Sequence, residues 1–135
     1  MKLSLAPNPW YWPREATFAF YRAMATQPVD IVYLGETVCS RRHELRAEDW
    51  LDLADELADA GKEVVLSTQA LIESESDLKA LRRLIARVAE GGRHMVEANE
   101  MSAVRLLAEA GLRFVAGPTL NVFNAHTLRL LVDQG

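Results

Sequence analysis

The sequence has one cysteine, Cys39, and no long apolar run. A single cysteine cannot form a disulfide within the chain, so nothing in the composition indicates an oxidising compartment. No apolar stretch approaches the ~20 residues that a membrane-spanning helix requires, and the N-terminus lacks the continuous apolar segment of a signal peptide. We therefore expect a cytoplasmic protein without a membrane span.

Basic residues are outnumbered as well, because 15 Lys and Arg stand against 19 Asp and Glu, a net charge of −4. This balance predicts no broad basic surface and hence no nucleic-acid partner. The sequence contains neither G-x-G-x-x-G nor G-x-x-x-x-G-K-[ST], and the first loop, APNPWYWP, lacks glycine. A phosphate cradle of the usual kind is therefore not expected. The motifs G-x-S-x-G and H-E-x-x-H are also absent.

Five short runs rich in apolar residues recur along the chain. They are near-continuously apolar rather than alternating, which is typical of parallel strands covered on both faces. The expected strands are residues 2–6, 29–35, 63–68, 94–98 and 113–117.

The segments between these runs have helical periodicity and recognisable ends. Residues 14–26 follow a proline, residues 48–60 begin with two acids, and Ser74 opens a capping box for a helix that ends at Gly91 and Gly92. Asn99 is predicted to cap a helix that ends before Gly111, and Asn124 is predicted to cap the last helix.

The resulting βα alternation predicts a single α/β domain with a parallel sheet. Two architectures fit, a five-stranded doubly wound domain and part of a (β/α)₈ barrel, which typically needs ~250 residues. At 135 residues, the pattern by itself favours the complete five-stranded fold. In both architectures the chemistry is expected at the carboxyl ends of the strands.

Cys39 follows the second expected strand and lies in a polar loop with Arg41, Arg42 and His43. A free cysteine is most often a buried and inert residue. The arginines would favour a thiolate, and a Cys–His pair with His43 would be a nucleophile. A metal or iron–sulfur ligand is a third interpretation, but such a site needs three or four ligands, and the chain has one cysteine and three histidines.

Two further sets of residues are candidates for binding. Glu36 and Glu97 could form a carboxylate pair above the sheet, although loop acids more often bond backbone amides or arginines. Asn121 is a candidate substrate contact beside the expected cap at Asn124. The aromatic cluster PWYWP, residues 9–13, could stack on a ligand, although covering the end of the fold is the commoner use.

Several segments together resemble a known family. They are DIVYLGETVCSRR, WLDLADELADAGKEVVLSTQAL, MVEANEMSAVRLLAEAGLRFVAGPTLNVFNAHTL and an early WYWP. These segments are similar to the UbiV-like branch of the collagenase-like family-U peptidases, and the match spans nearly the whole chain. Members of this branch are about twice as long, so the resemblance implies that the chain is the N-terminal half of a TIM-like barrel, a single partial domain over residues 1–135.

The resemblance implies a function in oxygen-independent ubiquinone biosynthesis. UbiV-like members are subunits that act with a UbiU-like homologue and with an accessory protein that binds the quinone precursor. Each subunit carries a [4Fe–4S] cluster, and together they hydroxylate the ubiquinone ring with prephenate as the oxygen donor. The cysteine that matches Cys39 is the first cluster ligand, and the other three ligands have no counterpart in this chain.

The resemblance also leaves alternatives open. A relative that cleaves peptides or modifies RNA bases, or a non-catalytic scaffold subunit, would share the fold. Because three of the four cluster ligands have no counterpart here, we expect the chain on its own to be inactive. Because a half-barrel leaves strand edges unpaired, we also expect the chain to self-associate.

Overall fold

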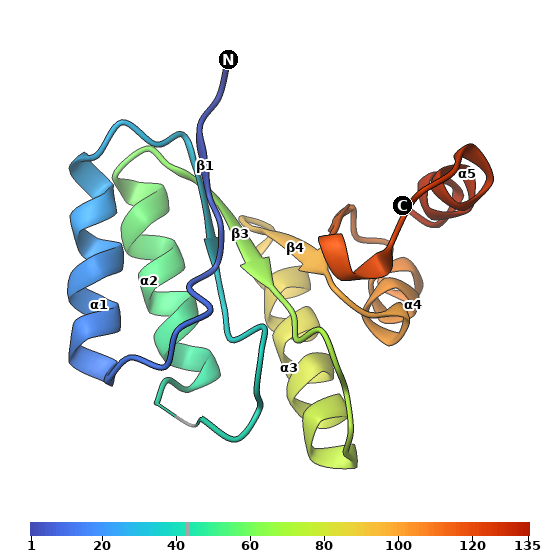
Figure 1. Cartoon of the computed structure of the whole chain (residues 1–135), viewed down its shortest axis with the longest axis horizontal. Helices are drawn as coiled ribbons and strands as arrows, with labels where there is room; N and C mark the ends of the chain where they lie inside the picture. Colours follow the sequence, from blue (N-terminus) through green and yellow to red (C-terminus); the bar gives the residue numbers. More distant parts are fainter. Residues whose placement is uncertain (43) are drawn as a thin grey trace.

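The computed structural model describes residues 1–42 and 44–135, in which strands and helices alternate along the chain (Figure 1). The strands are short, with two to five residues each. Two 3₁₀ helices are also present: η1 (Met24–Thr26) extends α1 (Arg14–Ala23), and η2 (Pro118–Leu120) follows β5 (Phe114–Ala116). The other elements are β1 (Ser4–Leu5), α1 (Arg14–Ala23), β2 (Ile31–Leu34), α2 (Ala47–Asp59), β3 (Glu63–Ser67), α3 (Glu75–Gly91), β4 (Met95–Ala98), α4 (Met101–Glu109), β5 (Phe114–Ala116) and α5 (Ala125–Gln134).

The strands form one parallel sheet in the order β1-β2-β3-β4-β5, so each strand pairs with the next one along the chain. Right-handed crossovers that always step in the same direction place every helix on the same side of the sheet. A doubly wound domain would instead need a reversal of strand order. The structure therefore corrects the preference of the sequence pattern for a doubly wound domain, and it has the consecutive βα units of a TIM-like barrel.

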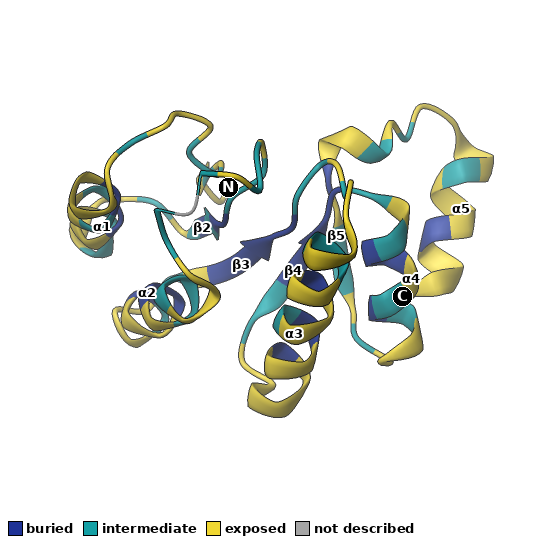
Figure 2. Cartoon of the chain, turned by 90° about the horizontal axis from the view of Figure 1, so that it is seen from below, coloured by how far each residue is buried: buried dark blue, intermediate teal, exposed yellow. Residues whose placement is uncertain are grey.

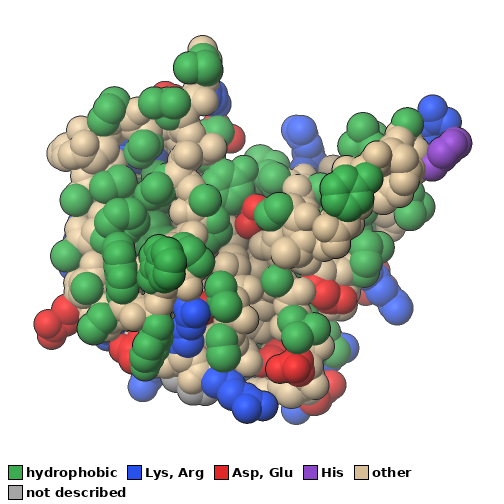
Figure 3. Space-filling view, in the orientation of Figure 1, with side chains coloured by type: hydrophobic (Ala, Val, Ile, Leu, Met, Phe, Trp, Pro, Cys, Tyr) green, Lys and Arg blue, Asp and Glu red, His purple; other side chains and the backbone are tan. Residues whose placement is uncertain are grey.

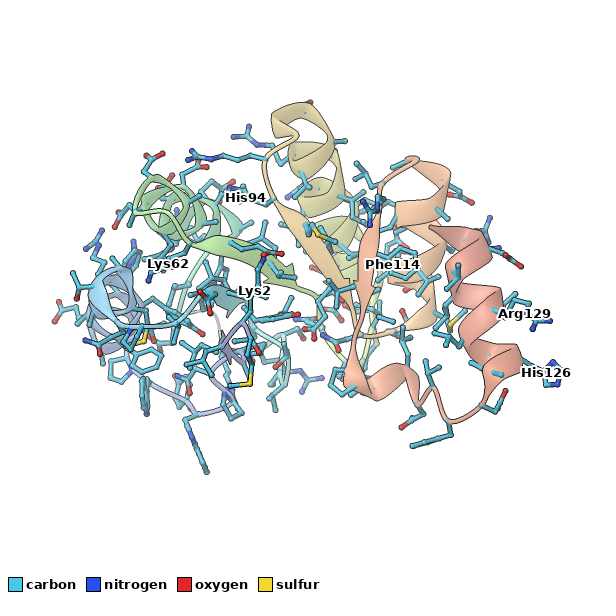
Figure 4. All side chains as sticks on the ribbon, turned by 90° about the horizontal axis from the view of Figure 1, so that it is seen from above. Lys2, Lys62, His94, Phe114, His126 and Arg129 are labelled. Carbon is cyan, nitrogen blue, oxygen red and sulfur yellow. The ribbon has the colours of Figure 1, made fainter. Side chains whose placement is uncertain are left out.

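The helices form an arc around the outside of the curved sheet (Figures 2 and 4). The core lies between them and the sheet, because alternate strand residues face the helices. Strand residues Val32, Leu34, Val64, Leu66 and Val96 pack there against buried helix residues. These helix residues include Leu53, Leu57, Leu81, Ile85, Val104 and Leu107.

The other face of the sheet carries the alternate residues and is not covered by a helix in the described part of the chain (Figure 4). The register pairs Tyr33 with Val65 and Ser67 with Glu97, which places these four side chains on this inner, concave face. The inner face of the carboxyl end of the sheet is therefore where polar residues of several strands can meet.

The predicted helix ends are largely confirmed. Ser74 caps α3 by accepting a hydrogen bond from the Asp77 amide at 3.1 Å, and Gly92 follows α3 in a left-handed conformation with φ 61°. Asn124 caps α5 through a 2.9 Å bond from the Thr127 amide. The prediction for Asn99 is wrong, because Glu100 caps α4 and the Asn99 amide bonds to the sheet instead.

Candidate functional site

The carboxyl ends of β3 and β4 carry a buried polar network. The Thr68 hydroxyl donates to the Glu97 carbonyl at 3.0 Å and accepts from the Asn99 amide at 3.0 Å, which ties the two strand ends together. The Asn99 side-chain amide donates both to the Thr68 carbonyl and to Glu97 Oε2, each at 3.0 Å. Glu97 is only 7% exposed and Asn99 only 4%. Asn99 thus holds a buried carboxylate in one orientation.

The segment after β5 closes the network from the other side. Thr119, in η2, donates its hydroxyl to the Asn99 carbonyl at 2.5 Å and lies 3.2 Å from Asn99 Oδ1. A Cβ at Gly117 would lie 2.0 Å from Asn99 Oδ1 and 2.9 Å from the Ala98 carbonyl oxygen. Glycine is therefore required at this position, because any side chain would displace Asn99.

A cavity of about 550 Å³, which we call the inner cavity, opens above this network on the concave face. Glu97 and Asn99 form part of its wall together with Tyr33. The rest of the wall is apolar or carries hydroxyl groups, and the lining residues include no Lys, Arg or His among those that the structure describes. They are Ser4, Ala6, Pro7, Thr37, Val38, Ala70, Pro118 and Thr119.

The pKa of Tyr33 reflects the burial and the negative charge around the inner cavity. Burial of the phenol raises the pKa of Tyr33 above its ordinary value, and the negative charges of Glu97 and, to a lesser extent, Glu63 raise it further. The phenol therefore remains neutral and available as a hydrogen-bond donor over the physiological pH range.

Cys39 lies in the loop between β2 and α2, four residues beyond Gly35, whose φ is 147°, and is partly buried. Glu36 organises this loop, since its Oε1 accepts the amides of Val38 at 3.0 Å and Cys39 at 3.2 Å. Arg42 Nη1 lies 3.5 Å from the same carboxylate oxygen. Two amides and a guanidinium thus fix the backbone that carries the thiol.

A second cavity of about 200 Å³, the outer cavity, lies between the sheet and the first turns of α2 and α3. Glu36 lines it together with Trp12 and Trp50. Trp12 packs edge-on against Phe20 at 5.3 Å between ring centroids, and Phe20 packs in turn against Tyr21. Trp12 of the cluster of residues 9–13 therefore packs on the helix side of the fold, while Trp10 and Tyr11 remain exposed. Figure 3 shows hydrophobic side chains gathered over α1 and the segment before it.

The candidate residues do not all come together. Glu97 borders the inner cavity, whereas Glu36 borders the outer one, so the two acids do not form a pair across one cavity. Asn121 is exposed with φ 54°, and its side-chain amide donates to the Thr119 carbonyl at 3.0 Å, next to the inner cavity rather than in its wall. His43 lies outside the described residues, so its pairing with Cys39 remains a hypothesis.

The remaining histidines lie away from the inner cavity. His94 contacts Asp55 of α2 at 2.9 Å, and His126 points outward from α5 with Arg129 (Figure 4). Within residues 1–42 and 44–135, no group of three or more His, Cys, Asp or Glu side chains is arranged to hold a metal ion. None of the helices described is long and apolar enough to cross a membrane.

Sequence reasoning missed Tyr33 and Thr119. It placed Thr68 and Asn99 at the carboxyl ends of strands, where chemistry is expected, but gave Thr68 no role and assigned Asn99 to a helix cap. Tyr33 and Thr68 lie in or directly after apolar strands, where they read as ordinary sheet residues. The available signal was position, since Thr68 and Asn99 each follow the last residue of a parallel strand.

The comparisons with known proteins agree with this architecture at the level of the family. No solved structure is significantly similar to the chain. The model of peptidase family U32 matches residues 17–135, which includes most of α1, all of α2 to α5, Cys39 and the whole polar network. With most of its length matched, the chain belongs to peptidase family U32.

Proposed function

We propose that this protein is a subunit of an oxygen-independent hydroxylase of the ubiquinone ring. In this proposal it acts with a homologous UbiU-like subunit and an accessory protein that carries the quinone precursor, and prephenate supplies the oxygen. Membership of family U32 supports the proposal at the level of the fold. The similarity of the segment around Cys39 to the UbiV-like branch supports it at the level of the subfamily.

The position of Cys39 is the observation that carries the proposal. The thiol lies beyond the carboxyl end of β2, in a loop whose amides are fixed by Glu36. A cysteine that binds a cluster needs an ordered loop of this kind, because hydrogen bonds and charges around the sulfur orient the ligand and set the reduction potential of the cluster. Arg42, held by Glu36 in the same loop, offers positive charge nearby.

The residues of this chain do not make a complete cluster site. A [4Fe–4S] cluster is held by four ligands, usually cysteines, and the sequence provides only Cys39. The described side chains also form no other group of metal ligands. The proposal therefore requires that the other three ligands come from residues outside this sequence.

The test is iron binding by the intact protein, purified without oxygen. We expect iron, acid-labile sulfide and the visible sulfur-to-iron absorption in the wild type, and loss of all three in Cys39→Ala. Val38→Ala is the matched control, because Val38 is the preceding residue and its side chain is exposed. Unchanged iron content in Cys39→Ala would reject Cys39 as a ligand.

The hydroxylase itself is tested separately from the cluster. Deletion of the gene should stop ubiquinone formation in cells grown without oxygen and leave it intact in aerated cells. If ubiquinone forms normally in both conditions, the protein has another function within family U32.

A further inference from the structure

We propose that the inner cavity binds an uncharged, hydroxyl-bearing ring with a ring hydroxyl donated to the Glu97 carboxylate, and that it rejects anionic molecules. The identity of the ring rests on the proposed function, since the quinone precursor is such a molecule. The rejection of anions rests only on the geometry of the cavity.

The charge of the part of the cavity wall that this chain supplies disfavours an anion. Its only charged lining residue among those described is Glu97, and no cation lies in the wall to offset it. A carboxylate ligand would lie beside a buried like charge, and burial weakens the screening that water would give at the surface. Prephenate carries two carboxylates, so in the proposed reaction its binding site lies elsewhere in the assembly.

The hydrogen bonds inside the network leave the Glu97 carboxylate able to accept a hydrogen bond from a ligand hydroxyl in the cavity. Its Oε2 is bonded to Asn99, and Asn99 is held from two sides by Thr68 and Thr119. An ionised carboxylate has about four acceptor positions, and hydrogen bonds to charged groups are the stronger ones. With its orientation fixed in this way, the carboxylate presents its remaining acceptor positions toward the cavity that it lines.

The rest of the wall suits a ring. Ala6, Pro7, Val38 and Pro118 supply apolar surface, and the neutral Tyr33 phenol provides a polar group that can donate or accept. A volume of about 550 Å³ falls in the range of small-molecule sites, which are mostly apolar with a few polar groups that fix orientation. A hydroxylated ring would contact the apolar residues with its ring atoms and bond the polar residues with its hydroxyl groups.

Calorimetric titration of the intact protein with catechol and with benzoate tests the proposal, since these rings are similar in size and differ in charge. We expect catechol to bind at least about tenfold more tightly than benzoate. Glu97→Gln should weaken catechol binding by about tenfold or more, because a charged acceptor is replaced by a neutral one. Glu90→Gln, on the exposed surface of α3, is the matched control and should change nothing.

A second variant keeps the test decisive if Glu97→Gln does not fold. Val38→Lys adds a cation to the wall from a residue that is 56% exposed and therefore tolerates a long side chain. It should raise benzoate affinity by about threefold or more. The proposal is overturned if the wild type binds benzoate as tightly as catechol, or if it does not bind catechol. It is also overturned if Val38→Lys leaves the affinity for benzoate unchanged.

The same titrations in Cys39→Ala separate this inference from the proposed function. Catechol binding should persist there, because Cys39 does not belong to the cavity wall. Loss of the iron site with retained catechol binding would support both proposals. If the wild-type protein binds catechol but never binds iron, the proposed role of the inner cavity is supported and the proposed hydroxylase function is rejected.

Discussion

At the scale of the residue, the side chains at the carboxyl end of β4 depend on one another. Asn99 bonds to Glu97, and Thr68 and Thr119 hold Asn99. In such a network a single change has effects beyond its own side chain, because each buried polar group relies on its neighbours for hydrogen bonds.

Replacement of Glu97 should be detectable at Tyr33. The negative charge of Glu97 is the second cause, after burial, of the raised pKa of Tyr33. Glu97→Gln removes that charge, so the pKa of Tyr33 should fall toward its ordinary value, measured by ultraviolet titration against Tyr33→Phe. A pKa that stays unchanged would place the two groups too far apart to share a ligand.

The raised pKa of Tyr33 also predicts how stability depends on pH. The neutral phenol is favoured in the folded state, so its contribution is fully present below the ordinary tyrosine pKa of about 10. The contribution is lost as pH rises through the higher pKa of the folded protein. Chemical denaturation of the wild type should therefore show a steeper loss of stability at alkaline pH than Tyr33→Phe shows.

Two glycines provide a contrasting pair of substitutions. Gly117→Ala should destabilise the protein by about 1–3 kcal/mol, because the new Cβ would overlap Asn99 Oδ1. Gly91→Ala, at the end of α3, meets no atom within 4 Å and should be neutral or stabilising by up to about 1 kcal/mol. Urea denaturation measures both, and equal effects would contradict the close approach at Gly117.

At the scale of the element, the helix ends decide where each βα loop begins and ends. In α3 a reciprocal capping box joins Ser74 and Asp77, with bonds of 3.0 Å and 3.1 Å between amides and side chains. The cap matters for function because the loop before α3 lies beside the one that carries Cys39, as the bond from the Ala70 amide to the Thr37 carbonyl at 3.0 Å shows.

Loss of the Ser74 hydroxyl should change the pKa of Asp77. Hydrogen bonds from Ser74 are the largest cause of the lowered pKa of Asp77, so Ser74→Ala should raise that pKa and cost about 0.5–2 kcal/mol for the lost cap. A depressed carboxyl pKa stabilises the fold above the ordinary Asp pKa and loses that effect as pH falls. The stability difference between wild type and variant should therefore shrink in acid, and Ser76→Ala in the same turn is the control.

At the scale of the whole molecule, the strand order divides the sheet into two faces with different tasks. The helix side holds the apolar core, and the concave side holds the polar network and the inner cavity. Changes in the core should therefore affect stability alone, while changes at the concave face should also affect ligand binding if the inner cavity is a binding site.

Leu107 tests the core. Its side chain is 0% exposed, so Leu107→Ala should cost about 2–5 kcal/mol for lost burial and the cavity that remains. Leu130→Ala is the matched control, because Leu130 is 54% exposed in α5 and its loss should change stability by no more than about 0.5 kcal/mol. Thermal and urea denaturation would reveal both effects, and a small cost at Leu107 would contradict the packing described here.

The sequence by itself determined the alternation of strands and helices, the caps at Ser74 and Asn124, and the glycine after α3. These features depend on neighbours within a few residues, where periodicity and capping chemistry act directly. The strand order was not accessible in this way, because a parallel pairing joins segments that lie far apart along the chain. The similarity to family-U peptidases, rather than the pattern, pointed to the barrel.

Only the tertiary structure decided how the polar residues are grouped. It separated Glu36 from Glu97 by placing them at different cavities, and it brought Thr68, Asn99 and Thr119 together from three strand ends. Asn99 shows the reason most clearly. Its local sequence favours a helix cap, but its side chain instead bonds to Thr68 and Glu97 in the buried end of the sheet, and Glu100 caps the helix.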